Sequence, residues 1–391
     1  MGLVAGACWL LVFSLMIGSF SLPRGVTCDF LSFYTGGLAA RHGAIARVYD
    51  LAYLRGIEAG LVPQAPDFLP FTRFPWFAVA LAPLTWLAVL PAFWVWASLQ
   101  MAAFAGICVW VFRRFGADAL LGCGLYLPTI FGLVLGQDGV WILLLVLAAF
   151  VLMERGRDGA AGAVLGLALV KFHLLLLFPL AFALRKRWRM LASFSLAGLA
   201  QALLFFVLEG AHGLGRYLDV LRWWGERSPR AEPYQFLSAR TILLNFGVES
   251  WWWSAFAITL VVALAWFCCR ETSREPWRWF AAAAIASVLI SPHAFRYDGT
   301  FLLLPILLCL FQAQSRVTRV AAGVAVSPLP QLVAVLGPPF WCAPAVSLLL
   351  LLGALAAESN GKAPDREAVE REVAAGPEAP ALNVASAMAD R

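Results

Sequence analysis

Long apolar runs are the feature that most limits what this chain can fold into. They follow one another through most of the 391 residues, with polar stretches between them. The runs lie at roughly 3–22, 75–90, 92–112, 119–135, 140–153, 160–183, 190–208, 251–269, 279–290, 299–313, 317–336 and 339–357. A helix needs about 20 apolar residues to cross about 30 Å of hydrocarbon. The sequence therefore predicts an all-α polytopic membrane protein with about 10–12 transmembrane helices.

The low content of charged residues narrows the function classes. Hydrophobic residues make up 62% of the chain and charged residues 13%, whereas a soluble globular chain has about 45–50% and about 25%. This composition excludes a soluble enzyme and a disordered protein. The formal net charge of +6 is spread over the loops between apolar runs, which is not the pattern of a nucleic-acid binder. We therefore expect membrane lipid as a partner and no nucleic acid.

Polar stretches divide the chain into a membrane domain and a tail. Two of them, at about 23–73 and about 209–250, are predicted to be long extracytoplasmic loops. The stretch 358–391 is rich in Ala, Glu and Pro and is predicted to be a disordered cytoplasmic tail. Residues 1–357 are expected to form one integral membrane domain. Its first span is predicted to be retained, because no basic n-region and no small-residue cleavage site precede Pro23.

Basic residues in short loops predict the orientation. If the N-terminus is cytoplasmic and the runs alternate strictly, the basic groups on the cytoplasmic side are Arg185–Arg187, the loop 270–278, Arg316 and Arg319. The loop around His293 then lies outside with both long loops. Arg113-Arg114 and Glu154–Asp158 also fall outside on this map, against the positive-inside rule. A re-entrant segment would change the middle of the map.

An acidic residue follows the first apolar run directly. The loop contains Asp29-Phe30-Leu31-Ser32-Phe33-Tyr34, an acid followed by aromatic residues at the expected membrane boundary. Such a carboxylate is suited to take a proton from a sugar hydroxyl while aromatic rings pack against a sugar or a lipid tail. Asp is also a preferred helix N-cap. Both interpretations of Asp29 are open from the sequence.

Several short motifs, in order and at characteristic spacing, resemble glycosyltransferase family 87. The first loop contributes Asp29-Phe30, Phe33-Tyr34, Gly43 and Val48-Tyr49-Asp50. Later motifs are Phe74-Pro75-Trp76, Ala82-Pro83-Leu84, Gly136-Gln137-Asp138, Gly166–His173, Asn245 and Ser291–Asp298. The chain departs from the family pattern at Trp76, Asp138 and Phe172, where the family tends to have Pro, Asn and Pro. The resemblance covers roughly residues 1–310.

The resemblance implies a fold and a reaction. Enzymes of this kind have the GT-C fold, reside in the bacterial plasma membrane and act on its extracytoplasmic side. They transfer a sugar, mannose in the relatives, from a polyprenyl-phosphate donor to a glycolipid or glycan acceptor, with inversion. By match to the first-loop acid of the family, Asp29 is the expected general base. Cysteine spacing gives no zinc site and no acidic pair suited to a metal stands near Asp29. We therefore expect no metal and no cofactor.

A phosphate leaving group needs cationic or hydrogen-bonding groups where negative charge grows. The candidates are Lys171, His293, Arg296 and Arg73. Lys171 is flanked by apolar residues, and a charged residue within a membrane span is costly, which favours a functional role. The same position is also compatible with a side chain that snorkels to the membrane surface. His293 follows Ser291-Pro292 and is alternatively a solvated loop residue. Arg296 alternatively forms a surface ion pair with Asp298.

The remaining pocket candidates are Phe33, Tyr34, Gln137, Asp138, Asn245 and Tyr297. Gln137 and Asp138 alternatively satisfy backbone groups at the tip of a re-entrant segment. His173 is expected to be structural, and Trp223 and Trp224 are expected to belong to an aromatic interface belt.

Two other functions stay open from the sequence. A secondary transporter would show two similar halves with paired broken helices, and no internal repeat is visible in the sequence. A catalytically inactive lipid-binding protein of the same fold is the other alternative, because fold does not fix function.

Overall fold

The computed structural model describes residues 29–62, 68–231, 235–247, 250–271 and 275–360. The first apolar run, Cys28 and most of the predicted tail lie outside these residues. Within them the chain is helical and contains no strand, apart from one isolated bridge between Phe236 and Phe295. The predicted all-α class is therefore confirmed.

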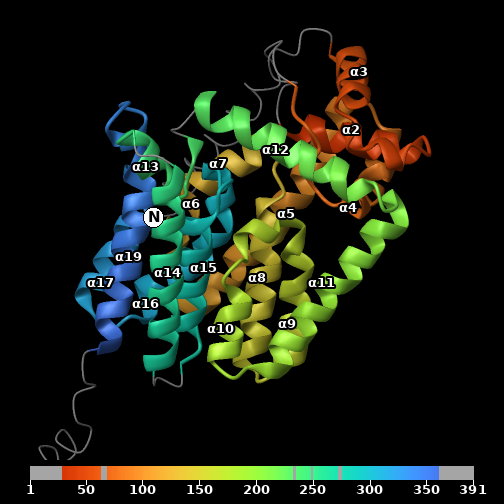
Figure 1. Ribbon diagram of the computed structural model, residues 1–391. Coiled ribbons are helices and arrows are strands. Elements are labelled where there is room, and N and C mark those ends of the chain that lie inside the picture. Colours follow the sequence, from red (N-terminus) through yellow and green to blue (C-terminus); the bar gives the residue numbers. More distant parts are fainter. Residues whose placement is uncertain (1–28, 63–67, 232–234, 248–249, 272–274, 361–391) are drawn as a thin grey trace, which may run out of the picture.

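Thirteen of the described helices form a bundle whose long members run between two ends (Figure 1). They are α5 (Val89–Phe115), α6 (Ala119–Leu125), α7 (Leu127–Val134), α8 (Gly139–Glu154), α9 (Asp158–Leu167), α10 (Phe178–Leu184), α11 (Trp188–Glu209), α14 (Ser250–Arg270), α15 (Trp277–Ile290), α16 (Leu303–Gln312), α17 (Arg316–Val326), α18 (Leu329–Ala334) and α19 (Ala343–Asn360). The helices at the upper end in Figure 1 are α2 (Phe30–Arg41), α3 (Leu51–Leu61), α4 (Pro75–Leu81), α12 (Gly213–Ala231) and α13 (Arg240–Asn245). Short 3₁₀ segments are η1 (Ile45–Arg47), η2 (Ala82–Trp86), η3 (Ala168–Leu174), η5 (Arg296–Leu302) and η6 (Phe340–Cys342).

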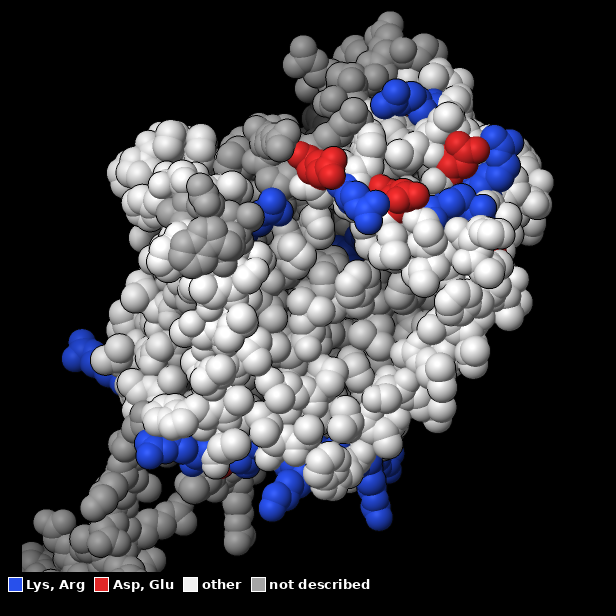
Figure 2. Space-filling model, viewed as in Figure 1, with Lys and Arg blue, Asp and Glu red and all other residues white. Residues whose placement is uncertain are grey.

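The outer surface of the bundle is apolar. Among the described helices, α5, α11, α14 and α19 are long and apolar enough to cross a membrane, and α8 and α15 are shorter apolar helices. Exposed side chains on α11 and α14 include Leu199, Val207, Ile258 and Val262, and Figure 2 shows a broad uncharged belt between the two ends. A water-soluble protein rarely exposes so large an apolar surface. The chain is a membrane protein, and the count of 10–12 crossings stays a prediction.

Basic residues collect at the lower end of the bundle in Figure 2. Ion pairs and hydrogen bonds tie successive helix ends together there: Arg114 with Glu154 (2.8 Å), Arg187 with Asp158 (3.0 Å), and Arg185 with the carbonyl oxygen of Cys268 (3.2 Å). We call this the arginine end. We call the opposite one, where α2, α3, α4, α12 and α13 lie, the cavity end, because the cavity described below opens there. Arg113-Arg114 and Glu154–Asp158 thus lie at the same end as Arg185–Arg187. The prediction that they lie on opposite sides was wrong.

Two apolar runs that were counted as crossings explain that error. Run 75–90 consists of α4, the η2 segment and the start of α5, and it stays at the cavity end beside α2 (Figure 1). Run 160–183 rises from the arginine end as α9, breaks at η3 and returns as α10. Run 75–90 does not cross the membrane, and run 160–183 returns to the end where it began. Each therefore adds one false crossing to the predicted map. The two errors cancel, so the predicted sides agree with the structure from Arg185 onward.

Close packing of α9 against α11 fixes the position of the η3 segment that follows α9. Gly162 and Gly166 face α11, and a Cβ atom added at Gly162 would lie 2.1 Å from the carbonyl oxygen of Met190. Small residues spaced in this way let two membrane helices approach closely. The α9 helix is therefore pressed against α11, and the η3 segment that follows it ends inside the protein near the cavity end.

The α2 helix is buried on nearly all its faces by α4, η2 and α5. Phe30 and Phe33 each have 2% exposure or less and pack against Phe93 and Trp96. Because this helix begins at Phe30, the aromatic core beneath it fixes the position of the preceding residue, Asp29.

Candidate functional site

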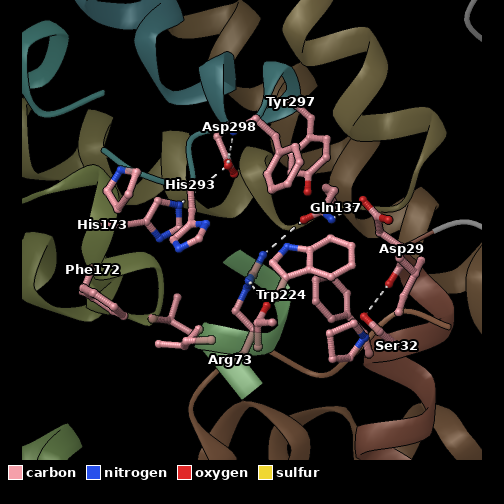
Figure 3. A pocket seen from close by; sticks show the side chains of 18 of the residues that line it. Asp29, Ser32, Arg73, Gln137, Phe172, His173, Trp224, His293, Tyr297 and Asp298 are labelled. Carbon is pink, nitrogen blue, oxygen red and sulfur yellow. Dashed lines mark hydrogen bonds and ion pairs between the residues drawn. The ribbon is translucent and has the colours of Figure 1, made fainter. Parts of the chain in front are cut away.

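A cavity of about 320 Å³ opens at the cavity end, beneath α12. Its walls come from segments far apart in the sequence: Asp29, Ser32 and Phe33; Leu69, Pro70, Thr72 and Arg73; Gln137; Val170, Phe172, His173 and Leu176; Tyr217, Leu221 and Trp224; and Pro292, His293, Phe295, Tyr297 and Asp298. Figure 3 shows His173 and His293 at one side and Asp29 at the other. The cavity is thus polar at both sides, with apolar walls between them.

Asp29 holds the N-cap position of α2, but its side chain makes no capping hydrogen bond. Its carboxylate oxygen Oδ2 instead accepts a hydrogen bond from Nε2 of Gln137. Burial raises the pKa of Asp29 to about 6, although the hydrogen bond from Gln137 and the positive charges of Lys171 and Arg73 act in the opposite direction. The side chain of Asp29 therefore does not act as a helix cap.

The turn that carries Gln137 packs directly on the residue after Asp29. Gly136 has φ +70°, and a Cβ atom there would lie 2.7 Å from Cβ of Phe30. The backbone N–H of Phe30 donates to the carbonyl oxygen of Leu135 (3.2 Å), and Nε1 of Trp96 donates to that of Gly136 (2.8 Å). A glycine is needed here both for the backbone conformation and for the close approach.

Four charged side chains form a buried network beside the cavity, and two of them, Arg73 and Asp298, also line it. Arg73 contacts Asp138 through two hydrogen bonds, at 2.7 and 3.1 Å. The Nζ atom of Lys171 lies 2.7 Å from Asp138 and 2.6 Å from Asp298. These two cations and two carboxylates balance, which is how buried charges are tolerated. Lys171 is 1% exposed, so it is not a snorkelling side chain.

The histidine side of the cavity lies close to α12. A Cβ atom at Gly225 would be 2.7 Å from Cε1 of His293, so only glycine lets α12 pass over this imidazole. Burial lowers the pKa of His293 to about 4, and the nearby His173 and Arg240 act in the same direction. The ring is therefore neutral at pH 7. Its buried Nδ1 has no hydrogen-bond partner among the described residues, which leaves it available to a ligand.

The structure brings most of the predicted site residues together. Those that line the cavity are Asp29, Phe33, Arg73, Gln137, His293 and Tyr297, while Lys171 and Asp138 belong to the network behind it. Three others are not in the cavity wall, so their predicted placement needs correction. The hydroxyl of Tyr34 donates to the carbonyl oxygen of Leu87 (2.8 Å), Nδ2 of Asn245 donates to that of Pro339 (2.9 Å), and Arg296 is buried in η5.

Three residues have a larger part in the site than the sequence suggested. Asp298 is 3% exposed and pairs with Lys171 rather than forming a surface pair. His173 lines the cavity, with Nε2 3.7 Å from Asp298. Trp224 lines it as well, because the predicted second loop contains α12. The spacing of Tyr217, Val220, Leu221 and Trp224 is that of an amphipathic helix and was the available signal.

No group of three or more His, Cys, Asp or Glu side chains suited to a metal ion occurs in the part of the chain that the structure describes. The two carboxylates of the network, Asp138 and Asp298, share Lys171 between them. A lysine ammonium thus occupies the position between them.

Comparison with known families identifies the chain. The profile of glycosyltransferase family 87 matches residues 71–292, which is more than half of the sequence. The chain belongs to glycosyltransferase family 87. It is therefore a membrane glycosyltransferase of the GT-C type, an enzyme that transfers a sugar from a donor to an acceptor. No curated protein and no solved structure matches it.

The segment that matches family 87 includes Arg73, Gln137 and Lys171, but it begins after Asp29 and ends before His293. The structure joins these outer residues to the matched segment, since Asp29 contacts Gln137 and His293 lies at the same cavity as Arg73. The cavity of this glycosyltransferase is therefore built both from the matched segment and from its two flanks.

Proposed function

We propose that this glycosyltransferase moves a hexose, mannose by resemblance, from a polyprenyl-phosphate donor to a hydroxyl of a glycolipid or glycan acceptor, with inversion. The observation that carries the proposal is the position of Asp29: a carboxylate at a cavity wall, unused as a cap, that faces two histidines across the space. That arrangement supplies a base at one side of a substrate and hydrogen-bonding groups at the other.

Asp29 is suited to act as the general base. A pKa of about 6 leaves the carboxylate mostly ionised at pH 7 while keeping it more basic than an exposed aspartate, and a catalytic pKa close to the working pH is the most effective. In the proposed step Asp29 takes the proton of the acceptor hydroxyl as the oxygen attacks the anomeric carbon. The bond from that carbon to the phosphate oxygen breaks, and its electron pair leaves with the polyprenyl phosphate. A single displacement inverts the anomeric carbon.

The donor phosphate is placed on the histidine side in this proposal. His293 has an unpartnered buried Nδ1 among the described contacts, and His173 lies beside it at the cavity. Lys171 and Arg73 are paired with carboxylates, so they act on the phosphate through their positive charge rather than as open ligands. A hydrogen bond placed where charge develops stabilises the departing phosphate.

The walls between the two polar sides suit a sugar and a lipid chain. Tyr297 and Trp224 present aromatic rings, which stack on sugar faces, and Phe172 and Leu176 continue the wall with apolar groups. Leu176 is 40% exposed, so the apolar wall reaches the outer surface, where a polyprenyl chain extends into the membrane.

The charge distribution supports the orientation that this reaction needs. Basic residues favour the cytoplasmic side of a membrane, and the arginine end is opposite the cavity (Figure 2). The cavity then faces the extracytoplasmic side of a bacterial plasma membrane. The proposed reaction uses no metal and no cofactor; Lys171 and Arg73, rather than a metal ion, pair with the carboxylates of the network.

The test is sugar transfer by the purified protein in lipid, with radiolabelled polyprenyl-phosphate mannose and a membrane lipid extract as acceptor. Asp29→Asn keeps the shape and removes the base, so we expect a loss of about a hundredfold or more. Asp118→Asn is the matched control, because Asp118 is an exposed aspartate that also precedes a helix, far from the cavity. Equal activity of Asp29→Asn and wild type would contradict the base. No transfer from any polyprenyl-phosphate hexose would contradict the donor class.

A further inference from the structure

We infer that Gln137 is the positioning residue of Asp29. Its side-chain amide is locked in one orientation, and in that orientation Nε2–H holds one carboxylate oxygen of the proposed base. The inference rests on the proposed function for its role in transfer, but the positioning itself is a property of the protein without substrate.

Two cations lock the amide. The oxygen Oε1 of Gln137 lies 3.2 Å from Nη2 of Arg73 and 3.4 Å from Nζ of Lys171. A flipped amide would turn its NH₂ group toward both cations and its oxygen toward the carboxylate of Asp29. Every contact would then be repulsive, because neither cation can accept a hydrogen bond. The amide of Gln137 therefore has a single stable orientation.

The backbone of Gln137 is equally fixed. Its N–H donates to the carbonyl oxygen of Gly132 at 2.8 Å, and the side chain is 4% exposed. The preceding Gly136 packs on Phe30, next to the base. Gln137 is thus held at both ends, and in Figure 3 its side chain and that of Asp29 point toward each other.

This arrangement ties one oxygen of the carboxylate and leaves Asp29 with a second oxygen for the acceptor hydroxyl. Gln137 is the group among the described residues that donates a hydrogen bond to the side chain of Asp29. The other charged or titratable groups that face Asp29 are Lys171, Arg73, Asp298 and Tyr297. They act on it through space, whereas Gln137 both lowers its pKa and sets its direction.

The experiment measures the protonation of Asp29 directly, without sugar transfer. The full-length protein in lipid nanodiscs is titrated with acid, and the carbonyl stretch of the protonated carboxyl group is followed by infrared difference spectroscopy. The same titration of a matching Asp29→Asn protein is subtracted. We expect a wild-type midpoint near 6. In Gln137→Met the midpoint moves upward by about one unit, because the hydrogen bond to the charged form is lost.

Activity gives the second readout. The acidic limb of kcat/KM moves upward with the infrared midpoint, since the base works only when it is deprotonated. At alkaline pH Asp29 is ionised in both proteins, so Gln137→Met recovers the part of its activity that protonation of Asp29 had removed. The variant stays about tenfold slower than wild type, because the carboxylate is no longer oriented. A residue with a purely structural role would lower activity equally at all pH values.

Gln201→Met is the matched control. Gln201 is also buried, at 6% exposure, and its Nε2 donates to the carbonyl oxygen of Gly166 at 2.7 Å, but it does not line the cavity. Its midpoint is expected to equal that of wild type. Gln137→Asn, which keeps an amide that is too short to reach Asp29, serves if Gln137→Met does not fold. A midpoint unchanged from wild type in the Gln137 variants would overturn the inference. A shifted midpoint in a protein whose wild type transfers no sugar would uphold the positioning and contradict the proposed function.

Discussion

Lys171 joins the parts of the site. Its ammonium group lies between Asp138, which precedes α8, and Asp298 in η5, and it is also 3.4 Å from the amide oxygen of Gln137. The backbone at Lys171 has φ −115° and ψ 57°, outside the helical region. The α9–η3–α10 segment therefore breaks at the residue that carries the charge, and this break lets the side chain reach both carboxylates.

Replacing Lys171 with Met is expected to destabilise the protein by about 3–5 kcal/mol, because it leaves a buried carboxylate without its main partner. Thermal unfolding in detergent, followed by tryptophan fluorescence, measures the change. The double variant Lys171→Met/Asp298→Asn removes both charges, while Arg73 still pairs with Asp138, so it is expected to regain most of the lost stability. If Lys171→Met unfolds at the wild-type temperature, the network is not what stabilises this region.

The crossing of α9 and α11 determines where Lys171 lies. We expect Gly162→Ala to destabilise the protein by about 1–3 kcal/mol and to reduce transfer, because the added methyl group meets backbone and pushes α9 away. Gly159→Ala lies on the same helix, where an added Cβ meets nothing within 4 Å. That control is expected to be neutral or more stable by about 0.5–1 kcal/mol. Equal unfolding temperatures for the two variants would contradict the role of close packing.

The helices show which features could be predicted from the sequence alone and which could not. Apolar runs predicted the all-α membrane fold, and motif resemblance selected Asp29, Gln137 and Lys171. Run length could not distinguish a crossing from a segment that turns back, because α9 and α10 together have the hydropathy of one span. Nor could it pair Lys171 with Asp298, 127 residues later, since that contact exists only once η3 and η5 meet. A buried lysine does require a carboxylate partner, and the sequence could not say which one.

In the molecule as a whole, the arginine end and the cavity lie at opposite ends, and charged residues occur at both. The arginine end gathers basic residues from the ends of α5, α8, α10 and α14, and the cavity end holds Asp29 and the histidines. The apolar belt between them is the part that meets lipid. A lipid-linked donor can then keep its chain in the membrane while its phosphate and sugar reach a cavity at one surface only.

This polarity predicts which thiols a membrane-impermeant reagent reaches in intact cells. Cys269 is exposed beside Arg270 at the arginine end, so it should be labelled only after the membrane is permeabilised. A cysteine introduced as Ala59→Cys, on the exposed surface of α3 at the cavity end, should be labelled from outside. Peptide mass spectrometry reads each site separately. Labelling of Cys269 in intact cells would reverse the orientation and place the cavity on the cytoplasmic side, where an outward-facing donor could not reach it.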